Sequence, residues 1–330
     1  MAGTLAAGIG WALVAGLMWG LVFVAPALLP DQSPALLSFG RYLAFGLIAL
    51  PLALRDRAAL ARLDRADWRA ALELAAVGNV LYYLCLSAAI QAAGVPLPTM
   101  VIGALPVVIA VCSNLTARDT AWGRLALPLA LVAAGVACVN LSELGARHGS
   151  AAAAGAGGQA AGLLLAVGAL ACWTWYPIRN ARWLRARPGL GPGTWATAQG
   201  LATLPLAAVG MAATLAWLAW APDAAGARVA GQGAAAGVPS PAGLLGADPW
   251  RYVGAMLALG LFASWLGTLC WNRASRLLPT SLAGQLIVFE TLAALLYGYL
   301  LRGAWPDALA WAGIVLLVGG VARAAGAARG

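Results

Sequence analysis

Ten apolar stretches follow one another along the 330 residues of the chain, and almost all charged residues lie in the gaps between them. A helix needs about 20 mostly apolar residues to cross the roughly 30 Å hydrocarbon core of a membrane. Backbone amides without partners are costly in lipid, so each stretch is expected to be helical. The pattern predicts an all-α, polytopic membrane protein. Its ten transmembrane helices are expected at about residues 8–29, 33–54, 70–92, 96–116, 123–141, 160–180, 193–220, 250–272, 281–301 and 306–323.

The composition agrees with this class of protein. Hydrophobic residues make up 62% of the chain and charged residues 9%, whereas a soluble domain is about 25% charged. The ten spans leave no room for a separate soluble catalytic domain. The first span is long and others follow it, so we interpret it as a true span rather than as a cleaved signal peptide.

The positive charge lies mainly on one side of the predicted membrane. The net charge of +9 comes from arginine alone, since the chain contains no lysine. With the N-terminus inside, fifteen arginines fall in inner segments, four in outer segments, and Arg41 within a span. Inner loops carry the excess of positive charge, so both termini are predicted to be cytoplasmic. The arginines do not gather on one face, which argues against nucleic acid as a partner.

The chain also repeats itself. Leu-Pro-Leu at 50–52 recurs at 204–206, an offset of 154, and Gly-Val-Ala at 135–137 recurs at 320–322, an offset of 185. Each half holds five predicted spans, and an odd number of spans reverses the direction of insertion. Inverted repeats are typical of secondary transporters, whose substrate sites lie near the midplane.

These offsets divide the chain into domains. We predict two inverted five-helix repeats, at 1–144 and 160–330, joined by a Gly/Ala linker at 145–159. The second repeat carries an inserted loop near 221–249, which accounts for the change of offset.

Two charged residues stand out because they lie well inside predicted spans, away from the span ends; a charge costs at least about 2.5 kcal/mol at the helix centre. Glu290 lies near mid-depth in the ninth span, and Arg41 lies several residues into the second. For Glu290 we consider a role in substrate binding or proton coupling beside a purely structural, helix-packing role. Arg41 is expected either to draw an anionic substrate group into a cavity, or to anchor at the outer interface or pair with a carboxylate.

Aromatic and amide side chains accompany these two charges. Such side chains suit a cavity for a small amphipathic metabolite, although aromatic residues near helix ends also form interfacial belts. The candidates besides Glu290 and Arg41 are Trp19, Asn79, Tyr82, Tyr83, Trp173, Tyr176, Gln199 and Asn272. Trp19 and Trp173 share the 154-residue offset and are therefore repeat partners.

The chain resembles the drug/metabolite transporter superfamily in its EamA-type, ten-span branch. The stretches that carry the resemblance are AGLMWG at 15–20, GRYLAFGLIALP at 40–51, GNVLYYLCLSAAIQAAG at 78–94 and IVFETLAALLY at 287–297. The resemblance implies inverted repeats, cytoplasmic termini, a central cavity, and export or exchange of small, often amino-acid-like metabolites in a bacterial inner membrane. The ninth span of this family commonly reads Glu-Pro. Here Thr291 follows Glu290, so a less broken helix is expected.

A flippase for a lipid-linked substrate is the main alternative, and a membrane scaffold is another. An intramembrane enzyme is disfavoured, because the one histidine, His148, lies in the linker, every aspartate lies in a loop or at a span end, and no P-loop or metalloprotease motif occurs. The expected partners are a small-molecule substrate and the lipid bilayer, with protons as a candidate coupling ion. No cofactor and no metal are expected, and the sequence gives no indication of oligomeric state.

Overall fold

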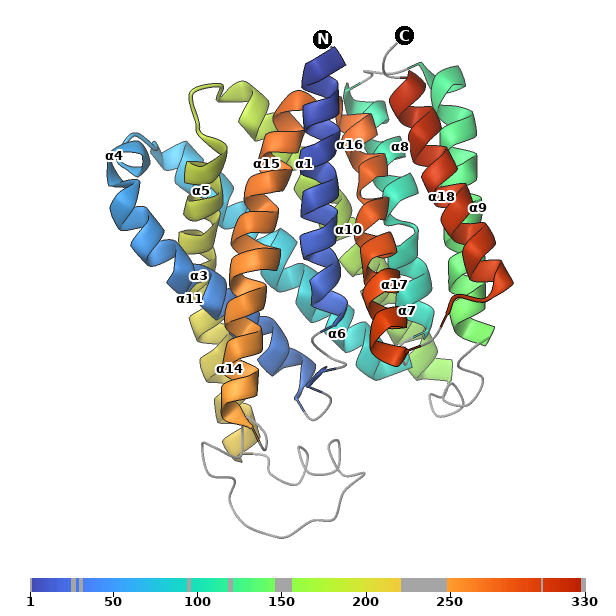
Figure 1. Cartoon of the computed structure of the whole chain (residues 1–330). Coiled ribbons are helices and arrows are strands. Elements are labelled where there is room, and N and C mark those ends of the chain that lie inside the picture. The colour runs from blue at the N-terminus through green and yellow to red at the C-terminus, as the bar shows by residue number, and fades with distance from the viewer. Residues whose placement is uncertain are drawn as a thin grey trace.

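The helices of the chain form one membrane-sized bundle (Figure 1). The computed structural model describes residues 2–24, 28–29, 32–93, 96–117, 121–145, 156–220, 248–303 and 305–327. Within these residues every regular element is helical. Eight helices are long and apolar enough to cross a membrane, and two shorter apolar helices cover Leu105–Leu115 and Ala308–Ala324. Together they account for the ten predicted spans.

The first five spans contain breaks as well as long helices. Span 3 continues through a π-helical segment, η2, and span 4 is interrupted at Ala104, two residues before Pro106. The elements are α1 (Ala2–Gly20), η1 (Leu21–Phe23), α3 (Pro34–Arg55), α4 (Arg57–Leu60), α5 (Arg65–Leu74), η2 (Ala75–Leu81), α6 (Tyr82–Ala93), α7 (Pro96–Gly103), α8 (Leu105–Ala117) and α9 (Trp122–Gly145).

The last five spans have the same plan. Span 8 contains a second π-helical segment, η4, and span 9 is interrupted at Ile287. The elements are α10 (Ala156–Ala186), α11 (Pro192–Trp220), α14 (Pro249–Ala258), η4 (Leu259–Leu266), α15 (Gly267–Leu277), α16 (Thr280–Leu286), α17 (Val288–Arg302) and α18 (Ala308–Ala327). Most of the predicted linker and of the inserted loop lies outside the described residues.

Close helix crossings show the repeat in three dimensions. α3 packs against its repeat partner α11, and α9 packs against α18. A Cβ atom added to Gly135 would lie 2.8 Å from Cγ of Leu317, and one added to Gly320 would lie 2.8 Å from Cγ2 of Val132. The 185-residue offset exchanges these two contacts, as a two-fold axis between the repeats requires. α1 runs away from the side of the termini and α10 runs toward it (Figure 1), so the repeats are inverted.

The two repeats are not separate bundles, because their first helices are exchanged. α1 packs against α15 and α17 of the second repeat, whereas α10 packs against α6 and α7 of the first. The molecule therefore contains two mixed groups of spans, 1 with 8 and 9, and 6 with 3 and 4. Any motion of one group against the other involves both repeats.

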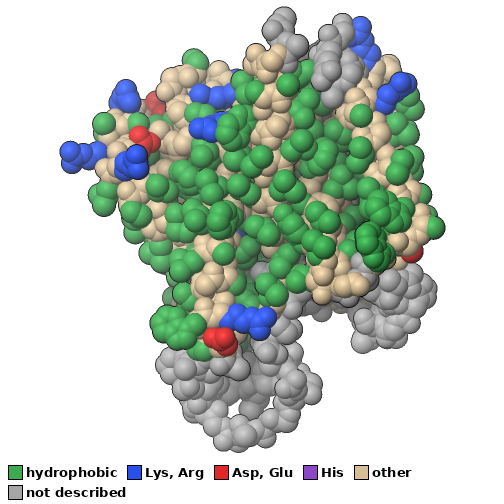
Figure 2. Space-filling view, viewed as in Figure 1, with side chains coloured by type: hydrophobic (Ala, Val, Ile, Leu, Met, Phe, Trp, Pro, Cys, Tyr) green, Lys and Arg blue, Asp and Glu red, His purple; other side chains and the backbone are tan. Residues whose placement is uncertain are grey.

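The outer surface is that of a membrane protein. Figure 2 shows a broad apolar band, with arginine side chains along the rim at the side of the termini. Leucines such as Leu164 are largely exposed on the helices. At the opposite ends of spans 7, 8 and 9, Trp220, Trp250 and Trp305 are more than four-fifths exposed, which is typical of an interfacial belt.

Candidate functional site

Glu290 occupies the first turn of α17, immediately after the break in span 9. Its backbone N–H donates to the carbonyl of Ile287 over 2.9 Å. Span 9 starts at Thr280, so Glu290 lies roughly 15 Å along it, near mid-depth. A helix N-terminus favours a negative charge. The interruption is confined to Ile287, whose dihedral angles stay helical, and it involves no proline. That Thr291 leaves this helix less broken than a Glu-Pro sequence would stays a prediction.

Two glycines of α1 allow α17 to pack closely against it near Glu290. A Cβ atom at Gly16 would lie 2.9 Å from Cβ of Phe289 and 3.1 Å from the backbone N of Glu290. A Cβ atom at Gly20 would lie 2.6 Å from Cβ of Ala293. The G-x-x-x-G spacing thus brings the α1 backbone against the acidic turn, in the manner of small-residue contacts between membrane helices.

The carboxylate of Glu290 is incompletely paired within the described part of the chain. Its Oε2 atom is buried and has no hydrogen-bond partner there. Arg41 interacts with it electrostatically, and Glu290 in turn acts on Tyr42 and Tyr82. The structure therefore brings Glu290, Arg41 and Tyr82, three of the predicted site residues, into one electrostatic neighbourhood, and it adds Tyr42, which the prediction had missed.

Arg41 is held by the π-helical segment of span 8. Its Nε donates to Oγ of Ser264 over 3.0 Å, and its Nη2 donates to the carbonyl of Ala263 over 3.5 Å. The guanidinium lies 5.1 Å from the ring centroid of Tyr42. In the other repeat the corresponding residue of η2 is Asn79, whose Nδ2 donates to Oγ1 of Thr203 over 3.0 Å. Each π segment thus bonds through a polar side chain to a helix of the α3–α11 pair.

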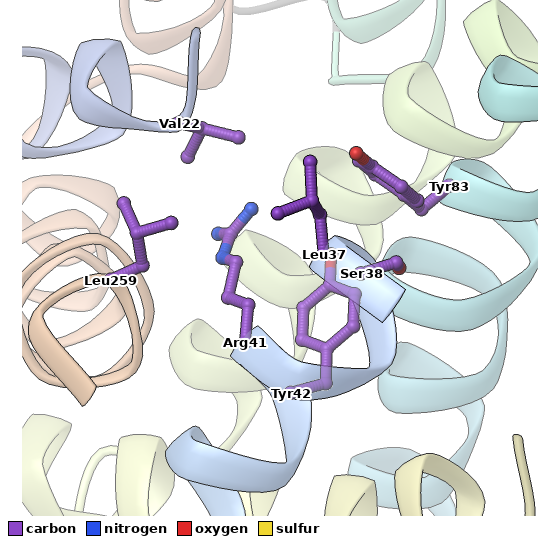
Figure 3. A pocket seen from close by; sticks show the side chains of 7 residues that line it. All are labelled: Val22, Leu37, Ser38, Arg41, Tyr42, Tyr83 and Leu259. Atoms are coloured by element: carbon purple, nitrogen blue, oxygen red, sulfur yellow. The ribbon is translucent and has the colours of Figure 1, made fainter. Parts of the chain in front are cut away.

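A small pocket opens beside Arg41 (Figure 3). Arg41 extends between Leu259 and Leu37, and Tyr83 lies beyond Leu37, on the side opposite Leu259. The pocket's volume is about 10 Å³, roughly the space of one water molecule. Its lining comes from Val22, Leu37, Ser38, Arg41, Tyr42, Tyr83 and Leu259. The first turns of α3 place it in the half of the molecule away from the termini (Figure 1).

Predicted aromatic residues form a continuous stack in the bundle interior. The ring centroids of Tyr82 and Trp173 are 4.9 Å apart, and those of Trp173 and Tyr176 are 5.1 Å apart. Trp19 meets its repeat partner Trp173 edge-on at 5.8 Å and Trp271 at 5.3 Å. The indole N–H groups of Trp173 and Trp271 are buried without a hydrogen-bond partner in the described residues. Trp271 was not among the predicted site residues.

Gln199 and Asn272 lie in a buried polar network that adjoins the aromatic stack at Tyr176. Tyr176 donates its hydroxyl to Oε1 of Gln199 over 2.8 Å. Oδ1 of Asn180 accepts from Nε2 of Gln199 and, over 2.8 Å, from Nε1 of Trp195. Nδ2 of Asn180 donates to Oδ1 of Asn272 over 2.8 Å. These side chains bond to one another and tie α10, α11 and α15 together.

Further contacts join the mixed groups of spans at the side of the termini. Arg185, on α10, donates to the carbonyl of Leu278 over 3.3 Å and to the hydroxyl of Thr280. Arg276, on α15, donates to the carbonyl of Arg187 over 3.3 Å. With the Asn180–Asn272 bond, they close the interface between α10 and the α15–α16 turn. We call these contacts the inner closure.

The comparisons with known proteins agree with this architecture. The model of the EamA-like transporter family matches residues 6–141 and 233–324. The chain belongs to the EamA-like transporter family. Arg41 and Glu290 both lie within the matched segments, whereas α10 and α11 lie between them. No group of three or more His, Cys, Asp or Glu that could hold a metal ion occurs in the described parts of this EamA-like chain.

Two similar proteins extend the comparison of this EamA-like chain. It is 46% identical over 327 residues to "Inner membrane protein YtfF" of Escherichia coli (strain K12), and the match covers 95% of the chain and 93% of that protein. A crystal structure of another protein superposes with a TM-score of 0.69 over 98% of both chains, at 19% identity. At that identity the likeness shows the fold alone.

Proposed function

We propose that this EamA-like protein is a secondary transporter for a small amphipathic, amino-acid-like metabolite, which it exports or exchanges across the bacterial inner membrane by alternating access. The observation that carries the proposal is the buried, unpaired carboxylate oxygen of Glu290, near mid-depth and in the electrostatic field of Arg41. Family membership supports transport, and the 46% identity to an inner membrane protein supports the location.

The charges suggest how such a metabolite is bound. An unpaired buried acceptor is costly, and a substrate ammonium group supplies the missing donor at Glu290. The guanidinium of Arg41 attracts a carboxylate, so the two residues together match a zwitterion. The aromatic stack that includes Trp19 and Trp173 offers apolar surface for the remainder of the substrate.

Protons are the proposed coupling ion at the same carboxylate. When Glu290 binds a proton, it loses its charge and no longer attracts an ammonium group, so proton binding and substrate binding compete. Such competition couples release of the substrate to uptake of a proton.

The pocket and the inner closure suggest how access to the site alternates between the two sides of the membrane. In the described conformation the pocket beside Arg41 lies in the half away from the termini, and the inner closure joins the helices on the other side. Opening toward the termini then requires the Arg185, Arg276 and Asn180 contacts to break while the groups move against each other.

Reconstitution tests the proposal. Purified protein in proteoliposomes is supplied with a panel of radiolabelled amino acids and related metabolites, and flux is measured with and without a pH gradient. We expect at least one panel member to be transported well above empty liposomes. Glu290→Gln should abolish transport or remove its dependence on the pH gradient, while the protein still inserts.

Glu73→Gln is the matched control, because Glu73 is half exposed and pairs with Arg179 at 3.0 Å on the surface. It should transport as the wild type does. A Glu290→Gln protein with wild-type rates at every pH would refute the coupling role. If no water-soluble panel member crosses faster than in empty liposomes, the metabolite proposal fails and the flippase alternative gains support.

A further inference from the structure

Five exposed arginines gather on one edge of the molecule, between residues 55 and 69. They lie at the end of α3, in α4, in the following loop and in α5. We call them the 55–69 arginine cluster: Arg55, Arg57, Arg62, Arg65 and Arg69. α4 lies at the outer edge of the bundle (Figure 1), and in Figure 2 positively charged side chains border the apolar band over this region.

The acidic residues of the same segment do not neutralise this cluster. Asp64 accepts from Nη2 of Arg187 at 3.0 Å, and Asp67 accepts from Nε1 of Trp183 at 3.1 Å. Asp56 accepts from the hydroxyl of Thr194. All three partners belong to the second repeat. No ion pair found in the described residues involves an arginine of the cluster.

Lipid-facing side chains lie directly beside the cluster. Leu54, which precedes Arg55 at the end of α3, is 76% exposed, and Leu72 is 46% exposed. Leu72 follows Arg69 by three residues on α5, so the two share a helix face. An apolar residue that faces lipid next to an arginine that faces water places the guanidinium at the level of the headgroups.

We propose that the 55–69 arginine cluster binds the headgroups of anionic phospholipids, whose acyl chains pack beside Leu54 and Leu72. The planar guanidinium matches phosphate oxygens in bidentate geometry, and clustered arginines next to a membrane helix favour acidic lipid. Because the same segment is bonded through Asp67 to the end of α10 and through Asp64 to the turn after it, bound lipid also stabilises the contact between the repeats.

Native mass spectrometry and thermal melting of the full chain in detergent test this proposal, with phosphatidylglycerol and phosphatidylcholine as probes. We expect wild-type protein to bind phosphatidylglycerol more tightly and to melt at a higher temperature with it. An arginine near an anionic surface contributes about fivefold to binding, so R57Q/R62Q/R65Q should bind phosphatidylglycerol about a hundredfold more weakly. Added salt should weaken binding to the wild type.

The matched control is R124Q/R182Q/R323Q, which removes the same charge from exposed arginines outside the cluster. This control should keep the preference for phosphatidylglycerol. If R57Q/R62Q/R65Q does not fold, R57K/R62K/R65K replaces it; that variant retains the positive charge and should also keep the preference. Equal binding of both lipids to the wild type would overturn the proposal. So would an equal loss in the control, or complete competition by inorganic phosphate. The readout is lipid binding, so it is independent of whether the proposed metabolite transport is correct.

Discussion

At the scale of single residues, Arg41 and Glu290 act on each other from different helices, α3 and α17. Both were predictable from the sequence, because a charge among some 20 apolar residues stands out and usually faces protein or water. The role of Gln199 was not predictable in this way. Its bond to Asn180 joins two spans, and hydropathy does not reveal which amide another amide meets.

Arg41→Gln tests whether the guanidinium draws the substrate. If its charge meets a substrate carboxylate, the variant should raise the KM of transport by about 10-fold or more, since a charged hydrogen bond contributes about 1.5–3 kcal/mol. Ser264→Ala is the control, because it removes the partner of Nε and leaves the charge; it should change KM by less than about threefold. Concentration-dependent uptake measures both. Equal effects of the two changes would show that only the structural bond matters.

At the scale of elements, the close contact between α1 and α17 leads to a separate prediction. Gly16→Leu inserts a side chain where even a Cβ atom would lie 2.9 Å from Phe289, and overpacking typically costs about 1–3 kcal/mol. The variant should melt at a lower temperature and transport more slowly, because the turn that holds Glu290 is displaced. Gly10→Leu is the control, since a Cβ atom there would meet nothing within 4 Å. Thermal melting in detergent compares them, and equal melting temperatures would contradict a tight α1–α17 contact.

The start of α5 predicts a dependence on pH. The backbone N–H of Asp67 and then Arg187 hold the pKa of Asp64 below its usual 3.8. A lowered folded-state pKa contributes stability that is complete above the ordinary value and is lost as pH falls through the folded value. Asp64→Asn should therefore melt below wild type near about pH 7, and the difference should shrink below about pH 4.

The measurement is the melting temperature of Asp64→Asn and of the wild type across this pH range. Glu73→Gln, a change in the same helix, is the control. Glu73 lies beyond the capping turn, so Glu73→Gln removes a carboxylate without removing a cap and should not reproduce the deficit of Asp64→Asn near about pH 7. A deficit for Asp64→Asn that stays constant down to low pH would assign its effect to packing and not to charge.

At the scale of the whole molecule, the span order followed from the sequence but the grouping of the spans did not. Hydropathy located ten helices because each must cover the same thickness of lipid. The two offsets predicted a duplication, and the odd number of spans in each half predicted its inversion. Nothing in that pattern says that α1 packs with α15 and α17 of the other repeat, because lipid-crossing helices present similar apolar surfaces to every neighbour. Close packing at small residues, as between Gly135 and Leu317, determines which helices become neighbours.

The exchanged helices make the inner closure a contact between the two mixed groups, so weakening it should shift the whole protein toward the state that is open at the termini. Ser275 reports this shift, because it is fully buried and lies one turn from Asn272 on the same face of α15. In a variant whose only cysteine is Ser275→Cys, Arg185→Gln with Arg276→Gln should speed labelling by a membrane-impermeant maleimide several-fold. Arg273→Gln is the matched control, since Arg273 stacks over Trp11 at 4.3 Å and forms no bond of the inner closure. If the double change leaves the labelling rate at the control value, these arginines do not hold this side closed.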